Sequence, residues 1–458
     1  AHASPRRTIL MTPSAPHSRV PRSMALYARA QELIPGGTQL ISRRPTRYAC
    51  GVSPVYAARA KGARFWDVDG HEYIDWASGI AAIILGYCDP IVDEAVREQI
   101  GRGINFSINH ELEVELAEEL VRTIPCAEMV RYAKCGGEAC AIAVRIARGA
   151  TGRDKVLFCG YHGWHDWYLA ANLDAEGNLN SHLFPGIEPI GVPKALAGTA
   201  IPFPYGDLAK LGETLDAHRG EVAAVIMEPL RSEMPAPGYL AGVQKLCRGH
   251  GAVLIFDEVS SGMRFGMSGA QGFVGVTPDM AVFAKSISNG YPMGMVVGQR
   301  DVMAPAARMF ISSTYWSDAI GLRAALSTIR ELRLRNVAAY LAQFGATLQT
   351  RINEAAREVG SGITCTGLSM HPHLEFPTSD SAVRTLLSTL YIQEMAKRGC
   401  HGYASFYLNA AQGEAELEQT VAAAKETFAI LAAGLAQGNL ESLLECEPQQ
   451  EAFRRLVR

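Results

Sequence analysis

Two short segments decide the fold, and each ends an apolar run with a charged residue. The first is Ala252-Val253-Leu254-Ile255-Phe256-Asp257-Glu258-Val259, and the second is Met280-Ala281-Val282-Phe283-Ala284-Lys285. Continuous apolar runs of this length are typical of strands that are buried on both faces, as in parallel sheets. Ligands of open α/β sheets bind at the carboxyl ends of the strands. We therefore expect Asp257 and Lys285 to lie at one crevice.

Short apolar segments alternate with helical patterns around these two strands. Further strands are predicted at 129–133, 155–159, 222–227 and 293–297, and helices at 138–150 and 240–249. This alternation predicts an α/β domain with a mainly parallel central sheet covered by helices. After residue 320 helical periodicity dominates, with strand-like pieces near Ile363 and His373.

The two ends of the chain are predicted to form a smaller α+β domain. Residues 24–75, which include a hairpin signal at Asp69-Gly70, would supply its N-terminal part, and residues 331–458 its C-terminal part. Residues 76–330 would form the large domain. Residues 1–23 lack the apolar region of a secretory signal peptide. They are rich in Pro and Arg, and we expect them to form a disordered arm.

The composition excludes several classes of protein. The 458 residues include 43 Lys and Arg against 46 Asp and Glu, a net charge of −3, whereas nucleic-acid-binding proteins carry a basic excess. The longest apolar runs are too short to span a bilayer. Ten cysteines without a Cys-x-x-Cys pair favour reduced thiols over a disulfide scaffold or zinc site, and so predict a cytoplasmic protein.

A glycine pair opens one of the predicted helices. In Lys134-Cys135-Gly136-Gly137-Glu138 it stands directly after a predicted strand. Backbone N–H groups at a helix N-terminus bind phosphate well, and glycine lets a ligand approach closely. The segment is a candidate phosphate cup, and the alternative is an ordinary glycine-rich turn.

Aromatic and titratable residues crowd the loop 160–167. Tyr161 and Trp164 offer flat faces for a planar ligand. His162, His165 and Asp166 could instead hold a metal ion, but neighbouring loop residues rarely converge on one ion without further ligands. We therefore predict no metal site here.

A phosphate cup, an aromatic face, a strand-end carboxylate and a strand-end lysine together describe a site for pyridoxal 5′-phosphate. The amine of a partly desolvated lysine is a suitable nucleophile for a carbonyl. Asp257 and Lys285 are 28 residues apart, within Phe256-Asp257-Glu258-Val259 and Ala284-Lys285. In these motifs the chain resembles the class III pyridoxal-phosphate-dependent aminotransferases, particularly the branch that includes glutamate-1-semialdehyde aminomutase. The resemblance extends from residue 24 to about residue 431.

The resemblance implies the type I fold of pyridoxal phosphate enzymes and a role for each matching residue. Lys285 would hold the cofactor as a Schiff base and move the substrate proton, and Asp257 would bond to the ring nitrogen. Tyr161 and Val259 would pack on the two ring faces. The remaining implied cofactor contacts are Cys135, Gly136, Gly137, His162, Glu228 and, from the neighbouring subunit of a homodimer with shared active sites, Thr314.

The substrate side of the site departs from the family pattern. Cys135-Gly136-Gly137 stands where the family usually has Ser-Gly-Thr, and Ser317-Asp318 replaces residues that normally follow the phosphate-binding threonine. Counting from the matching Pro35-Gly36-Gly37 places Arg43 where the aminomutase has an arginine for the substrate carboxylate. Arg44 beside it is a second candidate.

The preferred function is transfer of an amino group from an amino-acid or amine donor to a carbonyl acceptor. Trp164, Glu233 and Asp318 combine aromatic and acidic groups that would suit an amino-sugar aldehyde as acceptor. An amino-acid/keto-acid transaminase, an aminomutase and an epimerase remain open, because the cofactor motifs are the same for all of them.

Overall fold

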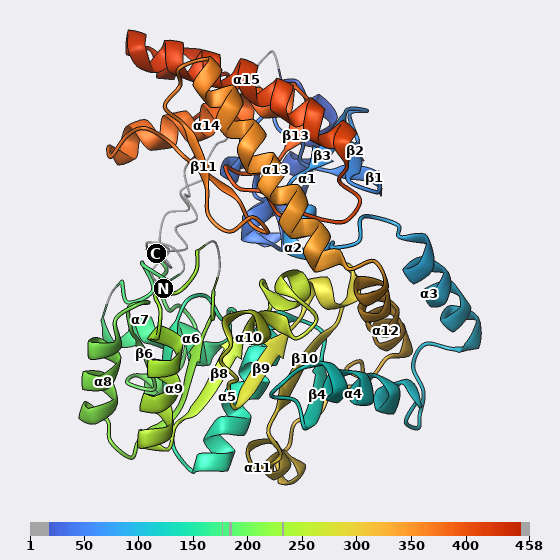
Figure 1. The fold of residues 1–458 in the computed structure, drawn as a ribbon, viewed down its shortest axis with the longest axis vertical. Coiled ribbons are helices and arrows are strands. Elements are labelled where there is room, and N and C mark those ends of the chain that lie inside the picture. The colour runs from blue at the N-terminus through green and yellow to red at the C-terminus, as the bar shows by residue number, and fades with distance from the viewer. Residues whose placement is uncertain (1–17, 176, 183–185, 231–232, 450–458) are drawn as a thin grey trace, which may run out of the picture.

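The computed structural model describes residues 18–175, 177–182, 186–230 and 233–449, which form two lobes (Figure 1). Residues 1–17 of the predicted arm lie outside the described residues. The arm was predicted to continue to residue 23, but helix α1 spans Pro21–Leu33 and so begins within it. Proline suits the first helical position, because its fixed φ matches the helix and its missing N–H is not needed there.

The lower lobe is built on a seven-stranded sheet with the order β4-β10-β9-β8-β7-β5-β6. Strands β5 to β9 run parallel to one another, and only β10 is antiparallel to both of its neighbours. The predicted α/β class with a mainly parallel sheet is confirmed. The strands are β4 (Met129–Ala133), β5 (Lys155–Cys159), β6 (Ala200–Pro202), β7 (Val222–Met227), β8 (Val253–Asp257), β9 (Met280–Phe283) and β10 (Gly294–Gly298).

Both faces of this sheet are buried. Along β8, Leu254 and Phe256 enter one hydrophobic core, and Val253 and Ile255 enter another. Helix α5 (Gly136–Thr151) covers the second face, and α4 (Leu112–Thr123) and α9 (Tyr239–His250) contribute to the first core. This double burial explains why the strand reads as an unbroken apolar run rather than as an alternating one.

The upper lobe contains a four-stranded sheet made from both ends of the chain. Its order is β1 (Ala57–Lys61), β2 (Arg64–Asp67), β3 (Glu72–Asp75) and β13 (Cys400–His401). β2 and β3 form the antiparallel hairpin predicted at Asp69-Gly70, and β13 pairs with β3 in parallel. A two-stranded sheet, β11 (Thr364–Thr366) with β12 (His373–Glu375), lies in the same lobe.

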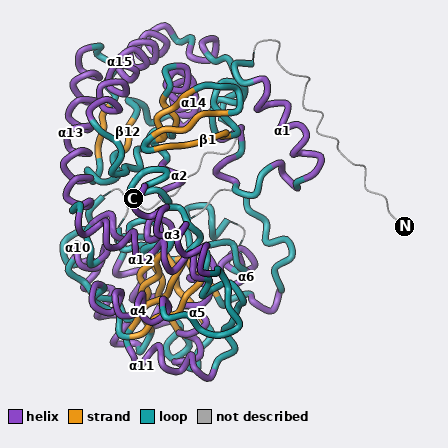
Figure 2. The backbone as a smooth tube through the Cα atoms, turned by 90° about the vertical axis from the view of Figure 1, so that its right-hand side faces the viewer, coloured by secondary structure: helices purple, strands orange, loops and turns teal. Residues whose placement is uncertain are grey.

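Helices pack around both sheets (Figure 2). The predicted domain boundary at residue 330 falls inside α12, which continues to Leu334. Of the described helices, none is both long and apolar enough to cross a membrane. The remaining helices are α2 (Ser78–Ala81), α3 (Pro90–Arg102), α6 (Asp166–Leu169), α7 (Ala171–Asp174), α8 (Leu208–Ala217), α10 (Gly269–Val274), α11 (Arg300–Met303), α12 (Ala319–Leu334), α13 (Val337–Glu358), α14 (Ser381–Lys397) and α15 (Glu414–Gln437).

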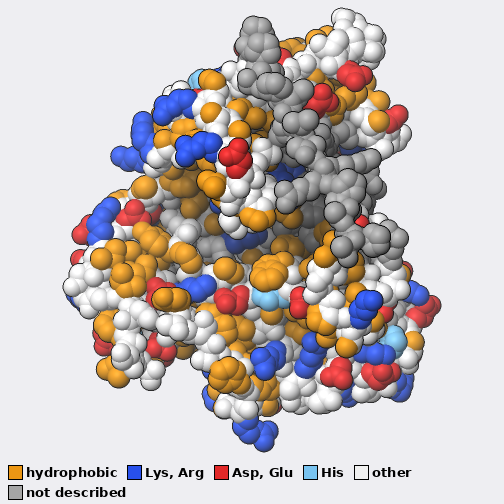
Figure 3. All heavy atoms as spheres, turned by 180° about the vertical axis from the view of Figure 1, so that it is seen from behind, with side chains coloured by type: hydrophobic (Ala, Val, Ile, Leu, Met, Phe, Trp, Pro, Cys, Tyr) orange, Lys and Arg blue, Asp and Glu red, His pale blue; other side chains and the backbone are white. Residues whose placement is uncertain are grey.

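The distribution of charged side chains and the free cysteines agree with the small net charge and the cysteine spacing of the sequence. On the face shown in Figure 3, basic and acidic side chains are interspersed rather than gathered by sign. All ten cysteines are free, and most are buried, whereas Cys88 and Cys135 are exposed.

One asparagine joins the loop after β9 to a distant segment of the chain. The Oδ1 of Asn289 accepts hydrogen bonds from the N–H groups of Ile84 at 3.0 Å and Leu85 at 2.9 Å. Its Nδ2 donates to the carbonyl oxygen of Gly86 at 3.0 Å. Ile84 in turn accepts from the N–H of Ala410, so the segment 84–86 bridges the large lobe and the C-terminal part of the chain.

We predict that Asn289→Ala lowers the free energy of unfolding by about 2 to 4 kcal/mol, because it leaves buried backbone groups without partners. Urea or thermal unfolding measures the effect. Asn336→Ala is the matched control, because Asn336 has the same left-handed φ of 47° but is exposed and makes no side-chain cap bond. Equal losses in the two variants would assign the effect to backbone conformation and not to the hydrogen bonds.

Candidate active site

Asp257 and Lys285 come together at the carboxyl edge of two adjacent strands. Asp257 is the last residue of β8 and lies opposite Val282 of β9. Lys285 follows β9 and opens a short 3-10 turn, Lys285–Ser288. Strands β8 and β9 are parallel, so their carboxyl ends lie at the same edge of the sheet, as the sequence pattern predicted.

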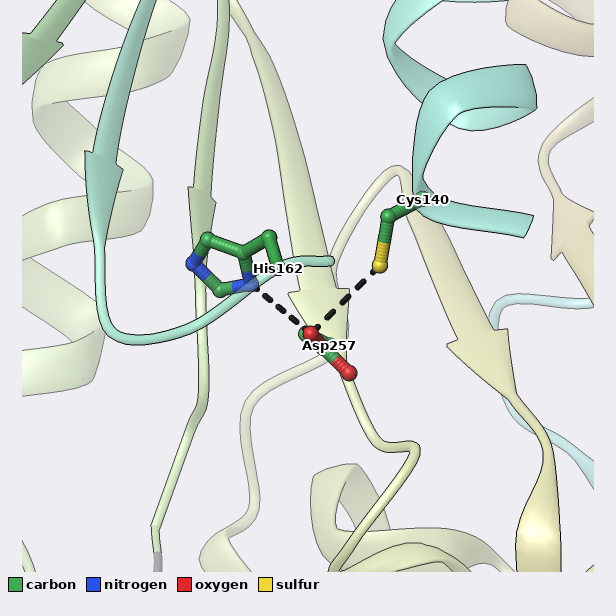
Figure 4. A group of neighbouring side chains, drawn as sticks. All are labelled: Cys140, His162 and Asp257. Atoms are coloured by element: carbon green, nitrogen blue, oxygen red, sulfur yellow. Dashed lines mark hydrogen bonds and ion pairs between the residues drawn. The ribbon is translucent and has the colours of Figure 1, made fainter. Parts of the chain in front are cut away.

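The carboxylate of Asp257 is buried and accepts three hydrogen bonds. Nδ1 of His162 lies 2.7 Å from Oδ2, and the thiol of Cys140 donates to the same oxygen over 3.5 Å (Figure 4). The N–H of Val259 donates to Oδ1 at 3.0 Å. Together these donors satisfy a charge that would otherwise be costly to bury.

The contacts of His162 keep Asp257 ionised. Its Nε2 lies 3.0 Å from the carbonyl oxygen of Cys159, and its Nδ1 faces the carboxylate. Since an ionised carboxylate only accepts, Nδ1 donates its hydrogen to Oδ2. Burial alone would raise the pKa of Asp257, but the hydrogen bond and charge of His162 and the N–H of Val259 bring it below the usual value.

Lys285 has an unusual backbone conformation. Its φ is 53°, in the left-handed region that residues other than glycine rarely adopt. Its Nζ donates to Oγ of Ser260 at 2.9 Å. The sequence had not pointed to Ser260, because a single serine after an apolar strand has no distinctive pattern.

The glycine pair at the start of α5 lies against the residues that follow β8. A Cβ on Gly136 would come within 2.7 Å of Cγ1 of Val259, and one on Gly163 would come within 2.7 Å of the Cα of Gly137. Only glycine permits these close approaches. The first N–H groups of a helix have no acceptor within it, so this end of α5 can bind a phosphate.

The loop 160–163 is anchored by hydrogen bonds to the backbone of Gly160. The N–H of Gly160 donates to Nδ1 of His182 at 3.1 Å, and the hydroxyl of Tyr168 donates to the carbonyl of Gly160 at 2.8 Å. Burial lowers the pKa of His182 to about 4, so its ring stays neutral and can accept. Glu228, directly after β7, is buried beside Gly160, with Oε1 3.3 Å from where a Cβ of that glycine would lie.

The aromatic residues of this loop differ in exposure. Tyr161 is partly buried and meets Tyr168 edge to face, with centroids 6.0 Å apart. Trp164 is 70% exposed and stacks on His165 at 4.6 Å. Nδ1 of His165 is buried without a hydrogen-bond partner among the described residues, and lies 3.6 Å from where a Cβ of Gly137 would be.

The residues that could share a metal ion differ from the set His162, His165 and Asp166 that the sequence suggested. The group of described residues close enough to share an ion is Cys140, His162 and Asp257, whose ligand atoms lie within 4.8 Å of one another. Burial, together with the charge of Asp257, raises the pKa of the Cys140 thiol, so the thiol is protonated and donates to that carboxylate. Hydrogen bonding explains the group without an ion.

The predicted substrate residues are not gathered as closely as the cofactor residues. Arg43 is exposed and Arg44 is partly buried, in the segment between α1 and β1. Glu233 is exposed. Asp318 caps α12 by accepting from the N–H groups of Ile320 and Gly321, and it also pairs with Lys134. These contacts give Asp318 a structural role, and its contact with substrate stays a prediction.

The residues of this edge fit pyridoxal 5′-phosphate. The cup at Gly136 and Gly137 offers N–H donors to a phosphate, and the unpartnered Nδ1 of His165 lies beside it. The Asp257 carboxylate suits a protonated ring nitrogen. Lys285 offers an amine on the adjacent strand end.

Comparisons with known proteins agree with this geometry. A family model described as aminotransferase class III matches residues 48–382. A 3-aminobutyryl-CoA aminotransferase of Cloacimonas acidaminovorans (strain Evry) is 34% identical over 425 residues, covering 90% of this chain and 97% of that protein. A glutamate-1-semialdehyde 2,1-aminomutase of Syntrophobacter fumaroxidans (strain DSM 10017 / MPOB) is 35% identical over 428 residues, covering 89% of this chain and 97% of that protein.

A solved structure shows the same fold with the cofactor. The pyridoxal phosphate form of the FumI protein of Sphingopyxis sp. MTA144 superposes with a TM-score of 0.80 at 25% identity, over 94% of this chain and 99% of that one. The match extends over both lobes, which confirms the predicted type I fold and the cofactor. The chain therefore belongs to the class III aminotransferases and is a pyridoxal-phosphate-dependent enzyme.

Proposed function

We propose that the protein is a transaminase in which Asp257 and Lys285 act at one cofactor. The observation that carries the proposal is the ionised, three-donor carboxylate of Asp257 at the end of β8, beside Lys285 at the end of β9. An aminomutase or an epimerase would use the same two residues, so these reactions are the alternatives.

Each residue has a definite task in this reaction. Bound at this edge, pyridoxal phosphate supplies a protonated ring that accepts electrons when the amine-bearing carbon loses a proton. Asp257 would hold the proton on the ring nitrogen. Lys285 would hold the cofactor through its ε-amino group and, once released by the incoming amine, take the proton from the substrate carbon. Gly136 and Gly137 would bind the phosphate, while Tyr161 and Val259 would pack on the ring.

The relatives and the placement of charged groups favour substrates that carry a carboxylate or a thioester. One relative is named for an amine at C3 of a coenzyme A thioester and another for glutamate semialdehyde. Arg43 is exposed and would bind the carboxylate of such a substrate. An amino-sugar acceptor remains a prediction that rests on Glu233 and Trp164, because Asp318 is already engaged by Lys134 and by α12.

The test is transfer of ¹⁵N from labelled amine donors, including α- and β-amino acids, to a panel of keto acids, semialdehydes and amino-sugar aldehydes. Transfer between molecules is expected. Rearrangement within one molecule would instead show an aminomutase, and racemisation without transfer an epimerase. Borohydride should attach the cofactor to the peptide of Lys285. Lys285→Ala should abolish this attachment and turnover, whereas the exposed Lys194→Ala should not.

We predict that Asp257→Asn lowers turnover about 10²- to 10⁴-fold and weakens cofactor binding far less. A neutral amide does not favour a protonated ring nitrogen as a carboxylate does. Single-turnover measurements of each half-reaction give the rate, and titration of the cofactor-free protein gives the affinity. Half-reaction rates close to those of the unaltered protein would remove Asp257 from the mechanism.

We propose that Thr314 serves a second subunit. It lies in the exposed segment before α12, between Phe310 (84% exposed) and Tyr315 (64% exposed). Contiguous exposed apolar patches mark association surfaces. This exposure supports the homodimer implied by the family, with Thr314 at the partner's phosphate. The reduced thiols support the cytoplasm as its location.

We predict that mixing two inactive variants, Lys285→Ala and Thr314→Asp, restores activity after subunit exchange. If Thr314 serves the partner, one site of the mixed dimer has both defects and the other has neither, so random exchange gives about a quarter of full activity. Lys285→Ala mixed with Asp257→Asn is the matched control and should stay inactive, because each site keeps one defect. A monomer by light scattering, or no recovery in proven mixed dimers, would reject the shared site.

A further inference from the structure

Cys140 contacts the catalytic carboxylate, and nothing in the proposed reaction requires it. It is 1% exposed on α5, with Sγ 3.5 Å from Oδ2 of Asp257. Figure 4 shows the thiol and the imidazole of His162 reaching the carboxylate from opposite sides. The nearby charges are those of Asp257, Glu228 and Lys285.

The hydrogen bonds of Asp257 leave one of its acceptor positions open. A carboxylate oxygen has two lone pairs. Oδ2 receives His162 and Cys140, so both of its positions are used. Among the described residues, Oδ1 receives the N–H of Val259 and no second donor. The remaining position is on Oδ1, and it is the one left for a ring nitrogen.

Helix α5 contacts the end of β8 and the turn after it. Gly136 lies against Val259 in that turn, and four residues later Cys140 contacts Asp257, the last residue of β8. Helix α5, which begins at the phosphate cup, therefore also contacts the carboxylate of Asp257 through its second turn.

We propose that Cys140 is a positioning residue for the cofactor. Its thiol occupies the second acceptor position of Oδ2, so the ring nitrogen binds Oδ1. The same hydrogen bond fixes the carboxylate relative to the phosphate cup at the start of the helix. The high pKa of the buried thiol keeps it protonated and able to donate. The inference rests on the cofactor site of the proposed function, and does not depend on the substrate.

The test compares Cys140→Ala, which removes the donor, with Cys140→Ser, which keeps one. Cofactor-free protein is titrated with pyridoxal phosphate, and the ring nitrogen is followed by ¹⁵N NMR with labelled cofactor. Cys140→Ala should weaken binding about three- to ten-fold and shift the ring nitrogen signal, the loss expected for one ordinary hydrogen bond, since a thiol is a weak donor. Cys140→Ser should stay within about two-fold of the unaltered protein and keep its signal.

Cys247→Ala is the control for loss of a buried thiol, because Cys247 is also 1% exposed on a helix but makes no contact with Asp257. It should change neither readout. Cys140→Val fills the space without a donor and replaces Cys140→Ala if that variant does not fold. An alanine or valine variant that matches Cys247→Ala in both readouts, or a serine variant as weak as alanine, would overturn the proposal. Cofactor binding without transaminase turnover would overturn only the proposed function.

Discussion

A buried negative charge at the end of a buried strand is the constraint on which the site depends. Removing a carboxylate from water is costly unless donors replace the water, and Asp257 receives its donors from three separate elements. His162 comes from the loop after β5, Cys140 from α5, and Val259 from the residues directly after β8. Satisfying this one carboxylate therefore fixes the loop, the helix and the strand end relative to one another.

The next residue shows how strongly the environment decides the chemistry of a carboxyl group. Glu258 is fully buried beside α10, where it accepts from the N–H groups of Ala270 and Gln271 and from the side chain of Gln271. Burial, together with the charge of Asp257, raises the pKa of Glu258 to about 7, whereas the hydrogen bond and charge of His162 lower the pKa of Asp257. Adjacent carboxyl groups thus differ in charge, with Asp257 kept ionised at the proposed cofactor site and Glu258 holding the N–H groups of α10.

Much of the fold and the centre of the site could be predicted because both are encoded locally. An apolar run that ends in Asp257 or Lys285 predicts, from a few consecutive residues, that a strand is present, that it is buried and which side chain stands at its end. The antiparallel direction of β10 and the short edge strand β6 leave no such pattern, because strand direction depends on distant pairing. Cys140 and Ser260 were missed for the same reason, since their importance comes from contacts across the fold.

The division between a predictable cofactor site and a less predictable substrate site has a structural origin. The cofactor residues stand on the edge of one rigid sheet and on α5, whose apolar faces leave little freedom in where those side chains point. Arg43 instead lies in a short 3-10 turn, and Glu233 and Thr314 lie in irregular segments; all three are outside this sheet and none of them is buried. A residue of that kind is positioned by its loop or by a second subunit, so its sequence neighbours do not determine what it faces. Chemistry common to the family is therefore fixed by the core, whereas the choice of substrate can change through exposed segments without disturbing the carboxylate on which the core converges.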